Sequence, residues 1–232
     1  MKAKRRFNIG LWVLLCVPCL LASCDHDVHD GEEEGGLSVS LTWADEADEG
    51  TEVEDVKLWI FDADKGSMIE EKHYGSTEEV ASQRFQLPEG TYRIQTFSNL
   101  TEPFFISEQT RALTNWNNIL IGLTNPKDVR NNAYFGVTDV KIDNKEGNYV
   151  VQTQKKKVLA ELTIIIENIP KGTEMSGKAL DCAMCLFPTQ KNSDGDYGLP
   201  SIEPTEVELP TLLATESTLK SEVIRLMPTI QG

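Results

Sequence analysis

The sequence is poor in positive charge, which excludes several classes of partner. Its 232 residues hold 22 Lys and Arg against 37 Asp and Glu, a formal net charge of −15. Nucleic acids and anionic lipid surfaces attract basic patches. We therefore expect no nucleic-acid partner and no docking on a membrane through surface charge.

Catalytic motifs are also missing. The sequence contains no G-x-S-x-G, no H-E-x-x-H and no P-loop. It has three histidines, and His73 is the only one outside the acidic segment 24–36, which leaves little material for a Ser–His–Asp triad. We expect no enzyme, no catalytic residue and no cofactor.

Three segments contain residue types that can bind a metal ion, but each lacks the further ligands or the rigid support that a metal site needs. His26 and His29 lie among aspartates in a segment that offers no rigid support, so solvated side chains are expected there. In "NSDGDYG", residues 192–198, a glycine stands between the acids and no Glu closes the loop, which favours a hairpin loop over a calcium site. Cys182 and Cys185 have C-x-x-C spacing, but zinc would need further nitrogen or sulfur ligands. We expect no metal.

The C-x-x-C pair could also be a redox motif, which normally opens a helix after a strand. Residues 178–188 predict a strand instead, where positions i and i+3 point to opposite faces. We interpret Cys182 and Cys185 as small hydrophobic residues. A local disulfide is the alternative if the strand breaks between them.

No apolar run is long enough for a transmembrane helix, which needs about 20 residues. The run at residues 9–22, "IGLWVLLCVPCLLA", has fourteen, and basic residues without any acid precede it. This order is typical of a secretory signal. It ends in "LASC", which resembles the bacterial lipobox and implies cleavage between Ser23 and Cys24, with lipid on Cys24; Cys16 and Cys19 lack these flanking residues.

A lipobox cysteine receives a diacylglycerol through its thiol and an acyl chain on its new amine, such as palmitate. Two acyl chains suffice for stable anchoring. We expect a signal peptide at residues 1–23 and a membrane-held mature chain that begins at Cys24. Its 18 basic and 37 acidic residues would give a net charge of −19. Residues 24–36 read as an acidic, glycine-containing tether. Acids in this place resemble the surface-export signal of Bacteroidota lipoproteins.

The rest of the chain alternates apolar and polar residues in short segments, typical of β-strands. At residues 56–61, Val56, Leu58 and Ile60 should face a core. After the turn at Pro88–Gly90, Tyr92 and Ile94 should point inward, with Arg93 and Gln95 outward. A short helical turn capped by Ser76 is expected between strands.

These signals predict an all-β fold of antiparallel sandwich type, without long helices. Residues 124–132, "TNPKDVRNN", read as a linker. We expect two tandem β-sandwich domains, at residues 37–125 and 126–232. Ile164 should lie in the core of the second, within the alternating stretch 158–166.

Trp43, Trp59 and Trp116 could stack against sugar rings. Core positions are the more usual role, because Trp43 and Trp59 fall within predicted strands. A surface glycan-binding lipoprotein is therefore the alternative function.

Four features follow one another in the chain: a lipobox, an acidic tether, "VKLWIFDADKG" at residues 56–66 and "LPEGTY" at residues 87–92. In this order they resemble the fimbrial anchor and fimbrillin family of Bacteroidota, the lipoproteins of type V pili. The resemblance covers residues 1 to about 125. It implies two transthyretin-like, immunoglobulin-like sandwiches and an anchor or accessory subunit of fimbriae, active in pilus assembly and adhesion on the outer membrane.

The resemblance also implies partners. Fimbrial subunits of that family join by strand exchange, in which an extended segment pairs with an open sheet edge. Polymerising pilins lose their first strand to a protease that cuts after a basic residue. Here no Lys or Arg lies between Cys24 and Lys57, so the first strand is expected to stay attached. The chain stops at "IRLMPTIQG", earlier than many members, so its final strand would be either missing or donated by a partner.

Overall fold

The computed structural model describes residues 35–107, 115–126, 129–201 and 203–228. The expected signal peptide, almost all of the tether, and with them Ser23 and Cys24, lie outside the described residues. All described residues belong to the unit that begins at Gly35.

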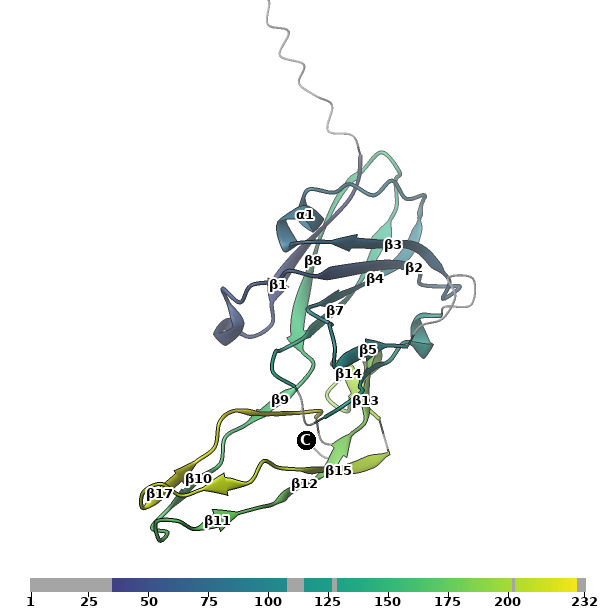
Figure 1. Ribbon diagram of the computed structural model, residues 1–232. Helices are drawn as coiled ribbons and strands as arrows, with labels where there is room; N and C mark the ends of the chain where they lie inside the picture. Colours follow the sequence, from purple (N-terminus) through teal and green to yellow (C-terminus); the bar gives the residue numbers. More distant parts are fainter. Residues whose placement is uncertain (1–34, 108–114, 127–128, 202, 229–232) are drawn as a thin grey trace, which may run out of the picture. The chain divides into compact units, whose positions relative to one another are not determined.

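Strands dominate this unit, which confirms the all-β prediction (Figure 1). The strands are β1 (Gly36–Trp43), β2 (Val56–Asp62), β3 (Met68–Tyr74), β4 (Gly90–Ser98), β5 (Phe104–Ile106), β6 (Ile121–Leu123), β7 (Tyr134–Ile142), β8 (Asn148–Lys157), β9 (Ala160–Leu162), β10 (Ile165–Glu167), β11 (Glu174–Met175), β12 (Lys178–Ala183), β13 (Cys185–Lys191), β14 (Tyr197–Pro200), β15 (Pro204–Glu208), β16 (Leu212–Leu213), β17 (Thr218–Lys220) and β18 (Ile224–Leu226).

The described helices are short: α1 (Thr77–Ala81) and the 3-10 turns η3 (Glu46–Asp48) and η4 (Trp116–Asn118). Ser76 caps α1, because its hydroxyl oxygen accepts the N–H of Glu79 at 3.3 Å, as the sequence predicts.

A six-stranded sheet with the order β1-β8-β7-β4-β2-β3 organises the first part of the unit. β8 joins β7 through only two residue pairs near its end, Tyr134 with Lys157 and Phe135 with Lys156. Along most of its length β8 pairs with β1 instead, and this pairing is parallel. The β1–β8 pair can therefore fold over the other four strands, and the parallel edge departs from the antiparallel pattern that was expected.

The first core lies between these two layers. As predicted, Val56, Leu58 and Ile60 of β2 lie in it, and all three are completely buried. Leu37 and Val39 of β1 enter the same core from the other layer. Its buried members are Leu37, Val39, Val53, Val56, Leu58, Ile60, Val80, Phe85, Leu87, Tyr92, Ile94, Ile142 and Val151.

A second core covers the opposite face of β2, β4 and β7. A four-stranded sheet with the order β14-β13-β6-β5 contributes to it. Phe61 of β2 and Ile121 of β6 are both completely buried there. The expectation that Arg93 and Gln95 point to solvent is therefore wrong: Gln95 is fully buried, and the Arg93 side chain is only 13% exposed.

The remaining strands form only two-stranded ribbons. In ribbon 1, β9 pairs with β18 and β10 with β17; in ribbon 2, β12 pairs with β15 and β11 with β16. At the turns the ribbons meet, where Gly172 donates to the carbonyl oxygen of Ala214 at 2.8 Å. We call both together the ribbon region. Ile164, expected in a core, is only half-buried, because no further strand layer covers it among the described residues.

The strand pairing crosses the boundary expected between residues 125 and 126. β7 and β8 follow that point but belong to the six-stranded sheet. β5 and β6 precede it, yet their sheet also contains β13 and β14. A division between residues 36–157 and the later ribbons follows the first sheet more closely. The tandem two-domain organisation stays a prediction.

Candidate functional site

The three tryptophans considered for sugar binding are each engaged by other side chains. Trp43 packs edge-on against Tyr134, and Lys155 Nζ lies 3.5 Å from the centre of its ring. Trp59 is buried in the second core, edge-on to Phe97. The guanidinium carbon of Arg93 lies 4.0 Å from the ring centre of Trp116. The rings therefore do not offer one shared, open stacking platform.

The cysteine pair lies where the expected strand is interrupted, since β12 ends at Ala183 and β13 begins at Cys185. Both thiols are free. Cys182 is buried in a small cluster with Val207 and Leu226, and burial, together with the nearby charge of Asp181, raises the pKa of its thiol. This supports the interpretation of Cys182 as a small hydrophobic residue. Cys185 is half-buried.

The segment at Asn192 is a hairpin loop between β13 and β14, as predicted. The side-chain oxygen of Asn192 accepts the N–H groups of Asp194 and Asp196 at 3.0 and 2.9 Å. Across the residues that the structure describes, no group of three or more His, Cys, Asp or Glu side chains could hold a metal ion. Within the same residues, no helix has the length and apolar character that a membrane span requires.

His73 lies on the edge strand β3, is exposed, and contacts a carboxylate oxygen of Asp55 through Nε2. It also lines a groove of about 660 Å³ between β3 and β5, together with Lys57, Trp59 and the exposed Phe105. The groove mixes charges of both signs with aromatic rings and brings no catalytic pair together.

The ribbon region carries a feature that the sequence did not predict, a groove of about 570 Å³ between its two ribbons. One wall is the continuous segment 207–213, which includes β16 and the end of β15. The other is the segment 220–226, which includes β18. Every residue of both segments lines the groove, whereas the face of a strand would present only alternate residues. The walls are therefore strand edges.

These edges have strand partners on one side only in the described part of the chain. β15 pairs with β12 and β18 pairs with β9, and each pair is a two-stranded sheet. Pro126 and Val129 also line the groove. An open edge presents main-chain N–H and C=O groups that a further strand could pair with.

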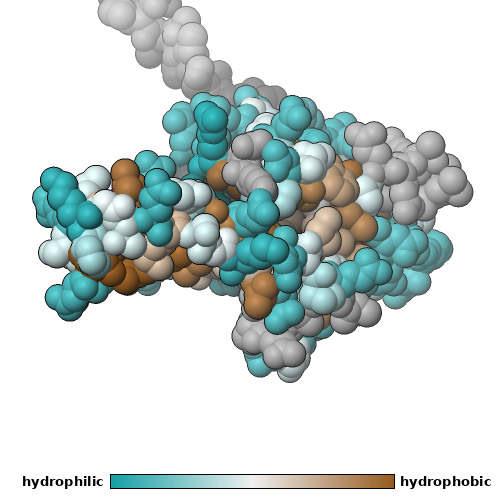
Figure 2. All heavy atoms as spheres, turned by 60° about the horizontal axis from the view of Figure 1, so that its bottom comes forward, coloured by the Kyte–Doolittle hydropathy of each residue, from teal (hydrophilic) through white to brown (hydrophobic). Residues whose placement is uncertain are grey.

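Exposed apolar side chains gather in the same region (Figure 2). Of the eight large hydrophobic residues that are exposed in the described structure, two lie elsewhere, Phe105 and Val150. The other six come from the ribbons and the break beside β12: Leu162, Ile165, Leu180, Met184, Leu213 and Val223. Leu213 and Val223, one on each wall of the groove, are 57% and 46% exposed. Clustered exposed apolar residues mark interaction surfaces.

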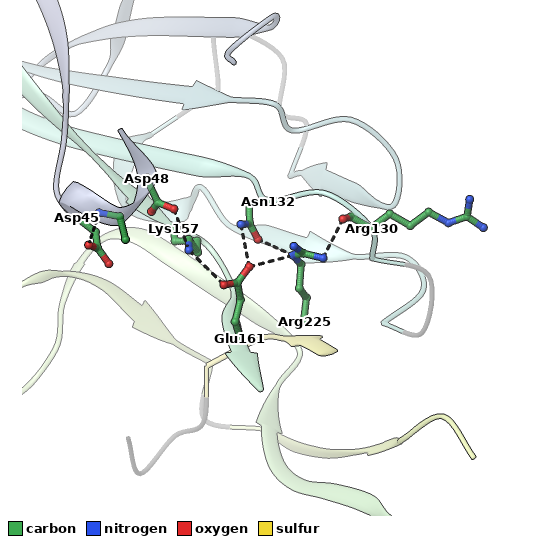
Figure 3. A network of polar contacts seen from close by, with 8 residues as sticks. Asp45, Asp48, Arg130, Asn132, Lys157, Glu161 and Arg225 are labelled. Atoms are coloured by element: carbon green, nitrogen blue, oxygen red, sulfur yellow. Dashed lines mark hydrogen bonds and ion pairs between the residues drawn. The ribbon is translucent and has the colours of Figure 1, made fainter. Parts of the chain in front are cut away.

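A polar network joins the start of ribbon 1 to the six-stranded sheet (Figure 3). Lys157, at the end of β8, lies 2.9 Å from a carboxylate oxygen of Asp48 and 3.6 Å from one of Glu161 on β9. Arg225 on β18 donates to the side-chain oxygen of Asn132 at 2.8 Å and lies 3.2 Å from Glu161. We call these residues the root network.

Hydrogen bonds and opposite charges set the protonation of this network. The hydrogen bond from Asn132, 3.0 Å long, lowers the pKa of Glu161, and the charges of Lys157 and Arg225 add to it against the opposing effect of burial. Burial disfavours the charge of Lys157, but the hydrogen bond and charge of Asp48, with Glu161, outweigh it and raise its pKa. Both shifts favour the charged forms of Glu161 and Lys157 at neutral pH, and the contacts of these side chains join the root of ribbon 1 to the six-stranded sheet.

Comparisons with known proteins bear on this arrangement. A family model described as fimbrillin-A associated anchor proteins Mfa1 and Mfa2 matches residues 24–209. Among curated proteins no significant match is found.

Three solved structures are similar. The fimbrial anchor protein Mfa2 from Porphyromonas gingivalis has 15% identity and a TM-score of 0.61, over 85% of this chain and 74% of that one. A proposed adhesin from Bacteroides ovatus has 13% identity and a TM-score of 0.51, and the match covers 81% of this chain and 66% of that one. A proposed polysaccharide-binding protein from Bacteroides thetaiotaomicron has 12% identity and a TM-score of 0.54, and the match covers 81% of this chain and 71% of that one.

At these identities the similarity of structure shows the fold alone, and this chain spans about two thirds to three quarters of the length of those proteins. The family model, in contrast, matches most of the sequence and begins at Cys24. The chain belongs to the family of fimbrillin-A associated anchor proteins Mfa1 and Mfa2.

Proposed function

We propose that this protein is an anchor or accessory subunit of fimbriae on the outer membrane, with a role in assembly and adhesion. The family match over residues 24–209 carries the proposal. The open edges and exposed apolar residues of the ribbon region support it, because an assembly subunit needs a surface for its neighbours.

Deletion of the gene tests this function. Cells that lack the protein should lose their fimbriae or release them into the medium, as seen by electron microscopy and by the fimbrial protein recovered from the medium. Unchanged fimbriae, equally well retained on the deletion cells, would refute the proposal.

We further propose that lipid on Cys24 holds the protein on the membrane. The lipobox-like "LASC" and the start of the family match at Cys24 support this attachment. Cys24→Ala should abolish labelling with a palmitate analogue and leave an unprocessed or soluble protein. Cys185→Ala, which removes a half-buried free thiol, is the matched control and should label like the wild type. Continued labelling of Cys24→Ala would exclude this lipid site.

The first strand should remain part of the mature protein, as an anchor requires. β1 contributes Leu37 and Val39 to the first core and pairs with β8 along its whole length. The nearest basic residue after Cys24 is Lys57, inside β2, where cleavage would divide the core. Mass spectrometry of protein from cells should find an N-terminus at Cys24. An unlipidated N-terminus between Trp43 and Lys57 would instead indicate a stalk or tip subunit.

A further inference from the structure

We propose that the groove between the segments 207–213 and 220–226 receives one extended segment of a fimbrial subunit, which pairs with the open edges of ribbons 1 and 2. This inference rests on the proposed function and names the site of contact. The contact with the fimbrial subunit is assigned to the ribbon region. The edge of β8 is not available for it, because β1 of this chain already pairs there.

The chemistry of the walls selects an extended polypeptide. Both walls are strand edges, so the groove offers rows of main-chain donors and acceptors that only another main chain can match along their length. The segment 220–226 contains no proline, so each of its N–H groups that points away from its ribbon 1 partner can donate to an occupant, whereas Pro210 interrupts the opposite wall. The occupant should therefore pair mainly with β18 and its preceding residues.

The dimensions fit one strand. A wall of seven residues is about 23 Å long at the usual rise of a strand, which accommodates about seven residues of an inserted segment. At the base of the groove Val207 and Leu226 are buried in the small cluster that contains Cys182. An incoming strand would extend this cluster towards the exposed Leu213 and Val223.

The side chains indicate the sequence of the occupant. Apolar residues from both walls, among them Leu209, Leu212 and Val223, would contact one face of the strand. Lys220 and Glu222 on one wall offer exposed charges of both signs, whereas the guanidinium of Arg225 is held by the root network. We expect apolar residues at alternate positions with polar residues between them, because successive side chains of a strand point to opposite faces.

Paired substitutions within the ribbon region test the site in cells. Leu213→Lys and Val223→Lys place a charge in the groove at positions that are already exposed, so the fold should persist. Leu180→Lys is the matched control, since Leu180 is 58% exposed on β12 but does not line the groove. Each variant replaces the deleted gene, and the fimbrial protein on cells and in the medium is measured.

We expect the two groove variants to release fimbriae as the deletion strain does, while Leu180→Lys retains them. Equal retention by all variants would overturn the groove assignment while the proposed function stands. Equal loss by all three would assign the contact to the general apolar surface and also overturn it. If the deletion strain itself keeps its fimbriae, the proposed function is refuted, and the groove assignment, which rests on it, is refuted with it. Melting temperatures of the purified variants, expected to match the wild type, verify that each is folded.

Photocrosslinking identifies the occupant. A benzoylphenylalanine at position 223 should crosslink to a fimbrial subunit, within a segment that has apolar residues at alternate positions. The same probe at position 180 should not give this product. A crosslink from position 223 to a second copy of this chain, or within the same chain, would overturn the assignment to a fimbrial subunit.

Discussion

The six-stranded sheet and the ribbon region are built from similar sequence patterns and differ in what covers them. In β2, residues on both faces are buried, because one core lies on each side of the sheet. In the stretch that forms β9 and β10, apolar residues alternate just as regularly. Yet Leu162 and Ile165 are exposed, and Ile164 is half-buried.

The difference shows what alternation can and cannot specify. It fixes which residues share a face of a strand, but burial requires a second layer of apolar side chains. The sheet obtains this layer twice, from β1 with β8 and from the sheet that contains β6 and β13. In the part of the ribbons that the structure describes, the buried cluster is small and is built around Cys182, Val207 and Leu226. An isolated two-stranded ribbon is marginally stable in water, so a partner strand would stabilise this region most.

The first prediction tests this difference with one substitution in each region. Ile60→Ala removes a completely buried side chain from the first core and should lower the free energy of unfolding by about 2–5 kcal/mol. Ile164→Ala removes a half-buried side chain from ribbon 1 and should cost about 1 kcal/mol or less, because less apolar surface is involved. Denaturant unfolding of purified protein measures both. Equal losses would show that the ribbon region is packed as tightly as the sheet.

Much of the sheet could be predicted from the sequence, because the signals there are local. The buried face of β2, the cap at Ser76 and the hairpin loop at Asn192 all depend on residues that are neighbours in the chain. The alternation predicts that Gln95 faces solvent, because a polar residue in an alternating strand normally faces water. The sheet that covers it contains β13, about ninety residues later, and no local pattern reveals this cover.

The candidate site was less predictable. Among the described residues, the facing edges of the two ribbons join no third strand, and the groove lies between them. The pairing of β15 with β12 and of β18 with β9 is set by contacts distant in sequence. The parallel alignment of β1 with β8 has the same origin. The exposed Leu213 and Val223 carry no signal that separates them from core residues. The root network joins residues from Asp48 to Arg225, and a charge pattern cannot bring those together.

The second prediction compares two ionic contacts of the ribbon region. Arg225→Ala removes hydrogen bonds to Asn132 and to the carbonyl oxygen of Arg130, as well as the contact with Glu161. We expect the free energy of unfolding to fall by about 1.5–3 kcal/mol, the range for hydrogen bonds of charged groups. Glu206→Gln weakens an ion pair with Lys178 that is more than half exposed, and should change stability by less than about 0.5 kcal/mol.

Hydrogen exchange locates the effect of the Arg225 substitution. Amides of β9 and β18 should exchange faster in Arg225→Ala, while those of β2 and β4 should keep their protection, since the first core is untouched. The same comparison in Glu206→Gln serves as the control. Faster exchange across the whole sheet in Arg225→Ala would mean that the root network supports the sheet as well as the ribbon.

The smallest effect expected is the pH dependence of the root network. The hydrogen bond from Asn132, with the charges of Lys157 and Arg225, lowers the pKa of Glu161 in the folded protein. Its contribution to stability is therefore complete above the ordinary pKa of a carboxyl group and is lost as the pH falls through the lowered value. Because the side chain of Glu161 is 35% exposed, we expect less than about 1 kcal/mol. Protection factors of the β9 and β18 amides, in which each exchange rate is divided into the intrinsic rate at the same pH, should fall more steeply with acid in the wild type than in Glu161→Gln, which has already lost the charge. Identical acid dependence in the two proteins would show that this carboxylate does not hold ribbon 1 at its root.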